Sequence, residues 1–417
     1  MKLRCIECGR IFEARETRTA CECGGLLEVE LSAASVDRAT LDGRLGALDH
    51  PLRSGVWRFR ELMPDFPDET VVSKPEGNTN LYHDNRLDDF AGVEVWFKHE
   101  GENPTGSFKD RGMTVGVSHA KWVGASIVAC ASTGNTSASV AAYASAAGLP
   151  SIVFIPEGKI SAAKLGQTIA YGPSVIQVRG DFDAAMRMVR DAAARHGIYL
   201  LNSLNPFRLE GQKSIVLEAL QQMRWVMPDW IVIPGGNLGN TSALGKALRE
   251  ALAAGLIDKM PRIAVSQAAG AAPFYHAHAT GFATYEPVSA STVATAIQIG
   301  NPVNYTKARR VILESEGTVT AVDDNAIMCA KAIVDGVGIG CEPASAAGLA
   351  GIRRLVSEGV ILPGERVLTY LTGHLLKDGD ANAAMYIEGS AGSSRMMAID
   401  PTAESLDRAM ERIHAIV

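Results

Sequence analysis

The chain has 417 residues, a formal net charge of −6, and 47% hydrophobic but only 6% aromatic residues. Its length and apolar content allow two or three domains around a large core. The mild negative charge argues against nucleic acid as the main partner, and no apolar run reaches the ~18 residues that span a membrane. The first residues lack the apolar core of a signal peptide. We therefore expect a cytoplasmic protein.

The segment 1–30 contains four of the seven cysteines, in "CIECG" and "CECGG". Cys5 and Cys8 form C-x2-C, and Cys21 and Cys23 form a tighter C-x-C after a spacer of twelve residues. Four clustered thiolates in a reducing compartment suit tetrahedral Zn²⁺ in a closed structural site. This spacing predicts a small zinc ribbon that metal would stabilise. A ribbon that has kept its thiols without metal is the alternative.

Residues 31–70 are mixed and polar and are expected to form a connector with one helix. After them, short β-rich runs alternate with Ala-rich stretches of helical pattern. The expected strands are 93–100, 126–132, 151–157, 174–180, 230–236, 262–268 and 366–373. The expected helices are 107–124, 135–149, 161–172, 181–197 and 240–256, with a further helical pattern in the tail, 401–417.

This alternation predicts an α/β fold with parallel sheets flanked by helices, since strands that are apolar on both faces are buried on both. In such sheets ligands bind beyond the carboxyl ends of the strands. The loops that follow the strands are therefore the places to look for chemistry.

The first such loop, "ENPTGSFKDRG", places Lys109 between a strand and a helix, just after two turn signals. A lysine there is either a solvated surface charge or a reactive amine. Two further loops, "ASTGNTSAS" at 131–139 and "PGGNLGNTSAL" at 234–244, precede helices. A helix N-terminus with free backbone N–H groups binds anions. Simple helix capping for the first and a tight structural turn for the second are the alternatives.

A fourth loop, "LTGHLLKDG", ends a strand at Thr372. Its hydroxyl either contacts a ligand at the sheet edge or satisfies local backbone. One lysine, one phosphate cradle and several small polar donors together suggest a cofactor that carries both an aldehyde and a phosphate. Lysine forms a Schiff base with such a carbonyl group.

These motifs together resemble the threonine synthase family, within the fold-type II pyridoxal-phosphate enzymes. "NPTGSFKDRG", "STGNTSAS", "NSLNPFRLEGQKS", "GGNLGN", "IGNP", "CEPASAAGLAG" and "LTGH" occur in family order between residues 77 and 378. The resemblance implies a two-domain fold, similar to the tryptophan synthase β subunit. The implied large cofactor-binding domain comprises 31–96 and 206–417, and the small mobile domain 97–205.

The resemblance also implies roles for single residues. Lys109 matches the lysine that holds the cofactor and acts as the catalytic base. The implied cofactor contacts are Lys109, Asn135, Gly236, Asn237, Leu238, Gly239, Asn240 and Thr372. The implied substrate contacts are Ser132, Thr133 and Thr136 for the carboxylate, and Asn202 and Arg208 for the phosphate.

The implied activity is a carbon–oxygen lyase reaction that turns O-phospho-L-homoserine and water into L-threonine and phosphate, in a homodimer. A paralogous enzyme similar to cysteate synthase, a hydroxy-amino-acid dehydratase and a non-catalytic regulator that binds pyridoxal phosphate are the alternatives. This sequence departs from the family pattern at Asn80, Leu375 and Gly379. Leu375 lies near the expected cofactor pocket, which keeps a paralogue in view.

Overall fold

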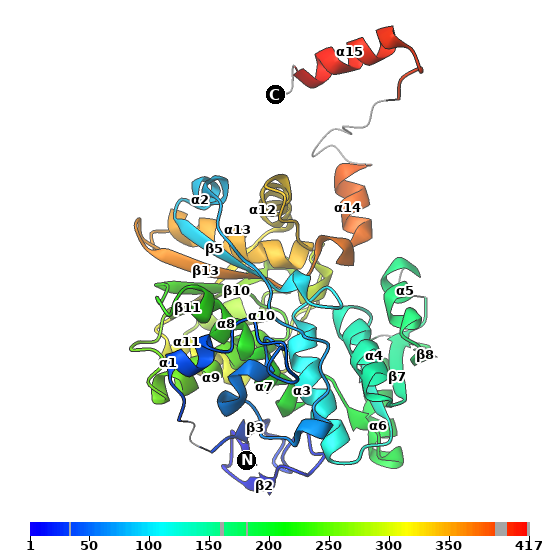
Figure 1. Ribbon diagram of the computed structural model, residues 1–417, viewed down its shortest axis with the longest axis vertical. Coiled ribbons are helices and arrows are strands. Elements are labelled where there is room, and N and C mark those ends of the chain that lie inside the picture. Colours follow the sequence, from blue (N-terminus) through cyan, green and yellow to red (C-terminus); the bar gives the residue numbers. More distant parts are fainter. Residues whose placement is uncertain (33–34, 159–161, 181, 388–397, 415–417) are drawn as a thin grey trace. The chain divides into compact units, whose positions relative to one another are not determined.

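The computed structural model describes residues 1–32, 35–158, 162–180, 182–387 and 398–414. The chain divides into two compact units, Met1–Lys377 and Asp378–Val417. The first unit contains three β-sheets and the helices that cover them (Figure 1). In the described residues, we find no helix with the length and apolar character to cross a membrane.

The N-terminal segment is a small antiparallel sheet of strands β1 (Lys2–Cys5), β2 (Ile11–Glu13) and β3 (Leu27–Glu30), in the order β2-β1-β3. Leu3 and Leu27 are fully buried, and Val29 is nearly so. Because these side chains alternate with exposed ones, one face of the sheet packs on the body of the protein.

The connector after this sheet contains one α-helix, as expected: α1 (Arg38–Asp42), capped by the Asp37 side chain. Two 3₁₀ helices follow, η1 (Trp57–Leu62) and η2 (Asp68–Thr70). The composition of the connector is mixed and polar, but its large aromatic side chains are buried: Trp57 and Phe66 are each 2% exposed. Aromatic residues in this segment therefore join the core of the first unit.

The larger sheet has six strands in the order β12-β11-β10-β13-β5-β4, and all neighbours are parallel except the short β4. The strands are β4 (Leu81–Tyr82), β5 (Glu94–His99), β10 (Trp230–Pro234), β11 (Arg262–Ala268), β12 (Thr318–Val322) and β13 (Arg366–Leu371). Alternate residues of one strand face opposite layers of helices: Leu368 and Tyr370 lie in one hydrophobic cluster, Val367 and Leu371 in the other.

Helices cover both faces of this sheet. The first cluster contains residues of α7 (Pro206–Gln212), α8 (Ser214–Gln222), α9 (Gly239–Ala253), α10 (Pro273–Ala279) and α11 (Tyr305–Glu314). The second contains residues of α2 (Asn85–Ala91), α12 (Asp324–Gly336) and α13 (Pro343–Ser357). Short 3₁₀ helices lie in the loops: η3 (Glu100–Glu102), η4 (Ala269–Ala271), η5 (Thr295–Ile297) and η6 (Leu375–Lys377).

The smaller parallel sheet has four strands in the order β8-β7-β6-β9. They are β6 (Val128–Ala131), β7 (Ser151–Pro156), β8 (Ser174–Val178) and β9 (Tyr199–Leu200). One face packs against α3 (Lys109–Trp122), α4 (Asn135–Ala147) and α5 (Ala162–Ala170), and the other against α6 (Phe182–His196). The predicted α/β class with parallel sheets flanked by helices is confirmed.

The predicted boundary between residues 96 and 97 falls inside β5. The division into a large domain and a small mobile domain stays a prediction.

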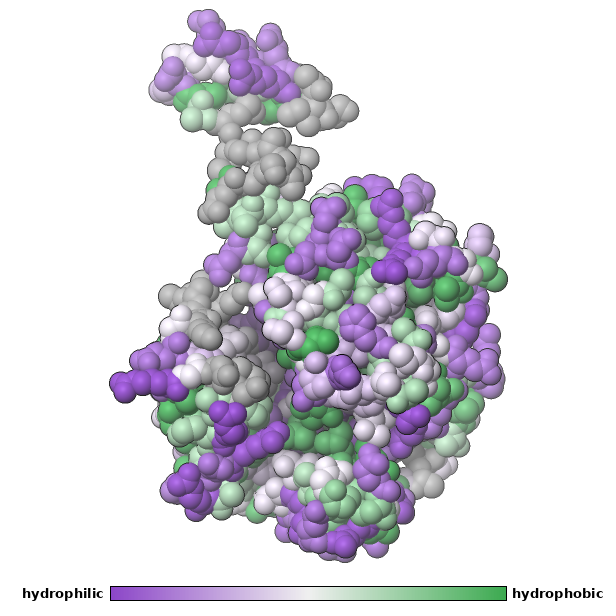
Figure 2. All heavy atoms as spheres, turned by 180° about the vertical axis from the view of Figure 1, so that it is seen from behind, coloured by the Kyte–Doolittle hydropathy of each residue, from purple (hydrophilic) through white to green (hydrophobic). Residues whose placement is uncertain are grey.

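The second unit contains α14 (Gly379–Tyr386) and α15 (Ala403–His414). The helical pattern expected in the tail is therefore confirmed for its described residues. On the face of the molecule seen in Figure 2, hydrophilic residues cover much of the surface, with hydrophobic residues between them.

Candidate active site

Lys109 is the first residue of α3 and lies where the chain leaves the six-stranded sheet. The loop before it is fastened to the end of β13: the Phe108 N–H donates to the Thr372 carbonyl oxygen at 3.1 Å, and Ser107 forms a bridge with Gly373. Because β5 and β13 are parallel neighbours, this loop lies at the carboxyl end of the sheet, as the sequence predicts.

Asp110 fixes the same loop. Its carboxylate accepts hydrogen bonds from the Thr105 N–H at 2.6 Å, the Thr105 hydroxyl at 2.6 Å and the Ser139 hydroxyl at 2.5 Å. Burial raises the pKa of Asp110 to about 6 even though these bonds favour the ionised form. Since Ser139 lies on α4, Asp110 ties the lysine loop to the helices of the four-stranded sheet.

The Lys109 amine is buried and has a lowered pKa. Burial has the largest effect, the Arg208 guanidinium also lowers the pKa and the Glu342 carboxylate raises it, and together they bring it to about 7. Nζ also lies 3.8 Å from the centroid of the Phe108 ring. At neutral pH a large share of this amine is unprotonated, which is the form that attacks a carbonyl group or takes a proton.

The glycine-rich loop after β10 leads into α9. Leu238 has a positive φ of 60°, and α9 begins at Gly239. A Cβ atom on Gly235 would lie 2.4 Å from a Val265 methyl group, so the loop needs glycine there. The Asn240 Oδ1 atom is buried and has no hydrogen-bond partner in the described residues. The N–H groups of this first turn have no intrahelical partner, so the loop can hold an anion.

The second predicted anion site is the start of α4. Gly134 N–H donates to the Ser132 hydroxyl at 3.3 Å, and α4 begins at Asn135. The Asn135 Nδ2 atom lies 3.2 and 3.0 Å from the two Glu342 oxygens. Ser132, Thr133, Asn135 and Thr136 are all partly exposed, so a ligand can reach them.

Thr372 is 5% exposed at the end of β13. Its Oγ1 lies 3.0 Å from the Ser345 hydroxyl and 3.4 Å from the Glu342 Oε1. The hydroxyl thus belongs to a buried polar group that also includes Asn135 through Glu342. The structure brings Asn135 and Thr372 together around one carboxylate, which also raises the pKa of Lys109 against the effect of burial.

Arg208 lies on α7 and is 2% exposed. Its Nη1 donates to the Leu201 carbonyl oxygen at 2.9 Å, and its Nε has no hydrogen-bond partner among the residues that the structure describes. In the part of the chain that the structure describes, no carboxylate pairs with it. Burial lowers the pKa of Arg208 to about 10. A buried cation without a counter-ion is costly unless an anion joins it, so this side chain is suited to bind one.

The Asn202 side chain already forms two hydrogen bonds within the protein, which the sequence does not show. Its Oδ1 accepts from the Ala131 N–H at 3.0 Å, and its Nδ2 donates to the Ala131 carbonyl oxygen at 2.9 Å. One amide hydrogen remains for a ligand. Asn202 therefore joins the strand that carries the Ser132 loop to the segment before Arg208.

Glu342 is the site residue that the sequence reasoning missed. The motif "CEPASAAGLAG" contains it, but no role was expected for this acid. The available signal was an acid directly before Pro343, at the start of a helix that follows a glycine-containing loop. Leu375, a departure from the family pattern, lies near this loop: a Cβ on Gly340 would be 3.3 Å from the Leu375 Cβ.

Two other basic residues in the same motifs as the expected site residues are structural. Arg111 is fully buried and pairs with Glu100 at 2.6 Å and Glu218 at 2.8 Å. Lys213, in the motif that contains Arg208, donates to the Leu62 carbonyl oxygen at 2.6 Å and pairs with carboxylates of α7 and α9.

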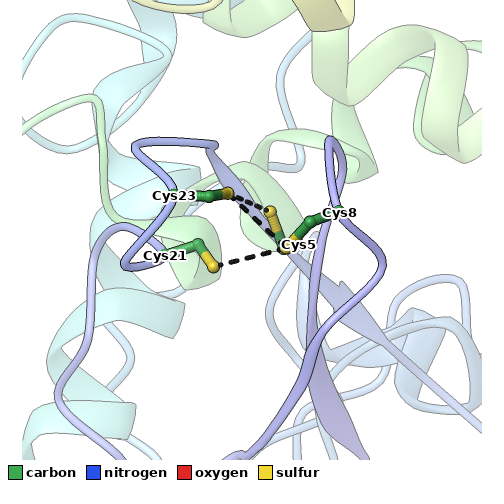
Figure 3. Close-up of side chains that lie close together, drawn as sticks. All are labelled: Cys5, Cys8, Cys21 and Cys23. Carbon is green, nitrogen blue, oxygen red and sulfur yellow. Dashed lines mark hydrogen bonds between the residues drawn. The ribbon is translucent and has the colours of Figure 1, made fainter.

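The four N-terminal cysteines form one cluster (Figure 3). Their sulfur atoms all lie within 4.8 Å of one another, with Cys5–Cys23 at 3.5 Å and Cys8–Cys21 at 3.6 Å. A tetrahedral zinc site with Zn–S bonds of about 2.3 Å has sulfur atoms about 3.8 Å apart. The arrangement therefore fits the predicted zinc ribbon.

Side chains of the body hold this ribbon by its backbone. Lys307 on α11 donates to the Leu27 carbonyl oxygen at 2.7 Å, and Lys246 on α9 donates to that of Val29. His119 on α3 places Nε2 2.7 Å from the Ala14 carbonyl oxygen. Since α3 carries Lys109 and α9 carries the glycine-rich loop, the ribbon is anchored on the helices that form the site.

Comparisons with known proteins agree with this geometry. Residues 72–373 match the family described as "Pyridoxal-phosphate dependent enzyme". The chain is 46% identical to a threonine synthase of Methanocaldococcus jannaschii over 91% of its length and 94% of the relative. It is 45% identical to one of Methanosarcina acetivorans over 90% of its length and 92% of the relative.

Solved structures share the fold at lower identity. Threonine synthase from Escherichia coli superposes with a TM-score of 0.72 at 22% identity, over 98% of this chain and 94% of that one. Maize serine racemase gives 0.65 at 22% identity, over 87% of this chain and 99% of that one. At such identities the likeness concerns the fold alone.

Proposed function

This chain belongs to the threonine synthases among the pyridoxal-phosphate-dependent enzymes, and we propose that it converts O-phospho-L-homoserine and water into L-threonine and phosphate. The observation that carries the proposed substrate is Arg208. A guanidinium that is 2% exposed and lacks a carboxylate partner in the described residues suits a phosphate group.

The residues present fit pyridoxal phosphate. Lys109 offers an amine with a pKa of about 7, which is suited to hold the carbonyl carbon. Residues 236–240, at the start of α9, would hold the phosphate group through backbone N–H groups. Thr372 and Asn135 would meet the ring nitrogen and the ring oxygen. When bound, this cofactor stores the negative charge that develops on the substrate carbons.

Side chains of the protein would bind the substrate and transfer its protons. Ser132, Thr133 and Thr136 at the start of α4 bind the substrate carboxylate, while Arg208 and the remaining N–H of Asn202 bind its phosphate. Lys109 Nζ takes the proton from Cα and then moves protons at Cβ. After protons have left Cα and Cβ, the Cγ–O bond breaks with release of phosphate. A proton is then added at Cγ, which becomes the methyl group of threonine, the OH group of water joins Cβ, and the second proton of water returns the hydrogen to Cα.

Closure of the part that contains the four-stranded sheet would exclude water until the step that consumes it. Asp110 and Glu342 support this proposal because both bond to residues of α4, Ser139 and Asn135. We also propose a cytoplasmic homodimer with a structural Zn²⁺ in the ribbon; the four thiols within 4.8 Å support the metal.

A steady-state assay of phosphate release tests the function. We expect release from O-phospho-L-homoserine with matching formation of L-threonine, and little release from O-phospho-L-serine with sulfite. Lys109→Ala should lose both the turnover and the visible absorbance that borohydride removes from the wild type. Sulfite-dependent turnover of O-phosphoserine would indicate a cysteate synthase instead, and a protein without cofactor absorbance would contradict the proposal.

A further inference from the structure

Glu342 is a carboxylate at the centre of the site, 5% exposed and directly before α13. Its two carboxylate oxygens accept hydrogen bonds from the Asn135 Nδ2 atom at 3.0 and 3.2 Å. Its Oε1 atom also accepts from the Thr372 hydroxyl at 3.4 Å. Asn135 is the first residue of a helix that packs on the four-stranded sheet, and Thr372 directly follows a strand of the six-stranded sheet. The Glu342 carboxylate therefore joins Asn135 and Thr372, two residues that are expected to bind the cofactor and that come from different sheets.

The chain is built to keep this carboxylate in place. A Cβ atom on Gly373 would lie 2.4 Å from the Glu342 Cδ and Oε1 atoms, so any side chain there would displace the acid. The Ser345 N–H donates to the Glu342 carbonyl oxygen at 3.0 Å, and the Ser345 hydroxyl accepts from the Gly373 N–H at 3.0 Å. Glu342 is thus held from both its backbone and its side chain.

The chemistry of the three groups fixes their orientation. An ionised carboxylate only accepts hydrogen bonds, so Asn135 must turn its NH₂ group, and not its oxygen, toward Glu342. The second hydrogen of that NH₂ group can then serve a ring oxygen nearby. Thr372 can donate to Glu342 or to a ring nitrogen while it accepts from Ser345.

We propose that Glu342 is a positioning residue, which orients the Asn135 amide and the Thr372 hydroxyl for the pyridine ring. The proposal rests on the proposed function, because both groups are expected contacts of the cofactor ring. The charge has a consequence of its own: Glu342 opposes the effects of burial and Arg208 on Lys109, so its loss should lower the pKa of Lys109 below about 7.

Glu342→Gln tests both parts, with cofactor-free protein and added pyridoxal phosphate. We expect about tenfold weaker uptake, measured by the absorbance of the bound cofactor, since one charge-assisted hydrogen bond is worth about that factor. Cofactor uptake falls as acid protonates Lys109, and we call this fall the acid limb of uptake. In Glu342→Gln it should move to lower pH. Glu342→Asp keeps the charge but is one methylene shorter, so uptake should stay weak while the acid limb returns toward that of the wild type.

Glu358→Gln is the matched control, because Glu358 ends the same helix, is exposed and pairs with Arg354 at 2.7 Å. It should leave both uptake and the acid limb unchanged. Wild-type uptake by Glu342→Gln would overturn the positioning role, and an equal pH shift in Glu342→Asp would overturn the role of the charge. Absence of uptake by the wild type itself would instead refute the cofactor site, and this proposal with it.

Discussion

Arg208→Met separates a ligand-binding cation from a structural one. The methionine fills much of the space of the arginine stem, which packs close to Gly116 on α3. Two charge-assisted hydrogen bonds to a phosphate, at about 1.5–3 kcal/mol each, would be lost. We therefore expect kcat/KM for O-phospho-L-homoserine to fall by roughly 10²–10⁴-fold. Absorbance of the bound cofactor should remain, because Arg208 is not an expected cofactor contact.

The stability of the cofactor-free protein should move in the opposite direction. Arg208 is buried with one carbonyl partner, so replacing it with an apolar side chain should be neutral or stabilising by about 1–4 kcal/mol. Arg111→Met is the control, because Arg111 is fully buried and paired with Glu100 and Glu218. Removing it leaves two buried acids with fewer partners and should cost about 3–5 kcal/mol.

Three measurements decide the case: kcat/KM, thermal unfolding of the two cofactor-free variants, and the acid limb of cofactor uptake. That limb should move to higher pH in Arg208→Met, since the guanidinium lowers the pKa of Lys109. An Arg208→Met protein that keeps its kcat/KM, or that is destabilised as much as Arg111→Met, would show that Arg208 is structural.

Two further predictions concern the ribbon. A chelator under reducing conditions should release about one Zn²⁺ per chain and lower the unfolding temperature, and Cys8→Ser should have the same two effects. Cys329→Ser is the control, because Cys329 lies outside the cluster, and this variant should retain the metal. A protein that is purified without metal and unfolds at the same temperature after chelation would contradict the prediction. His119 is neutral in the folded protein because burial lowers its pKa to about 4 from 6.5, so the unfolded chain binds more protons between these values and stability should fall as pH drops from about 6.5 to 4. His119→Gln should lose this part of the pH dependence in urea unfolding, and an unchanged profile would contradict it.

The sequence predicted two kinds of element: strands that are apolar on both faces, and long Ala-rich helices. The strands β5, β6, β7, β8, β10, β11 and β13 and the helices α3, α4, α5, α6 and α9 lie within the expected ranges to a few residues. Other elements lacked such a signal. The strands β4 and β9 have two residues each, and β12 alternates threonine with apolar residues although all but its first residue are buried.

Helix α13 illustrates a different difficulty, because its first half consists of small residues. A Cβ on Gly348 would lie 2.5 Å from the Thr369 hydroxyl oxygen, and one on Gly351 would lie 2.5 Å from that of Ser266. These glycines allow the helix to approach the sheet closely, a requirement that hydrophobic periodicity does not show. The motif "CEPASAAGLAG" was therefore visible as a motif with a helix start at Pro343, but the close approach to the sheet that positions Glu342 was not.

The site depends on charged side chains whose partners lie far away in the sequence, so a local sequence motif does not show which of them are paired. Arg111 and Arg208 both lie in motifs that mix basic residues with glycine and acids, yet Arg111 pairs with Glu218, 107 residues later in the chain, and Arg208 pairs with no carboxylate in the described residues. Glu342 likewise bonds to Asn135 across 207 residues. Because these pairings arise only when the two sheets come together, the fold decides which buried charges remain available. A cation left without a counter-ion at the carboxyl end of a parallel sheet is then a better indicator of an anionic substrate than any spacing of basic residues.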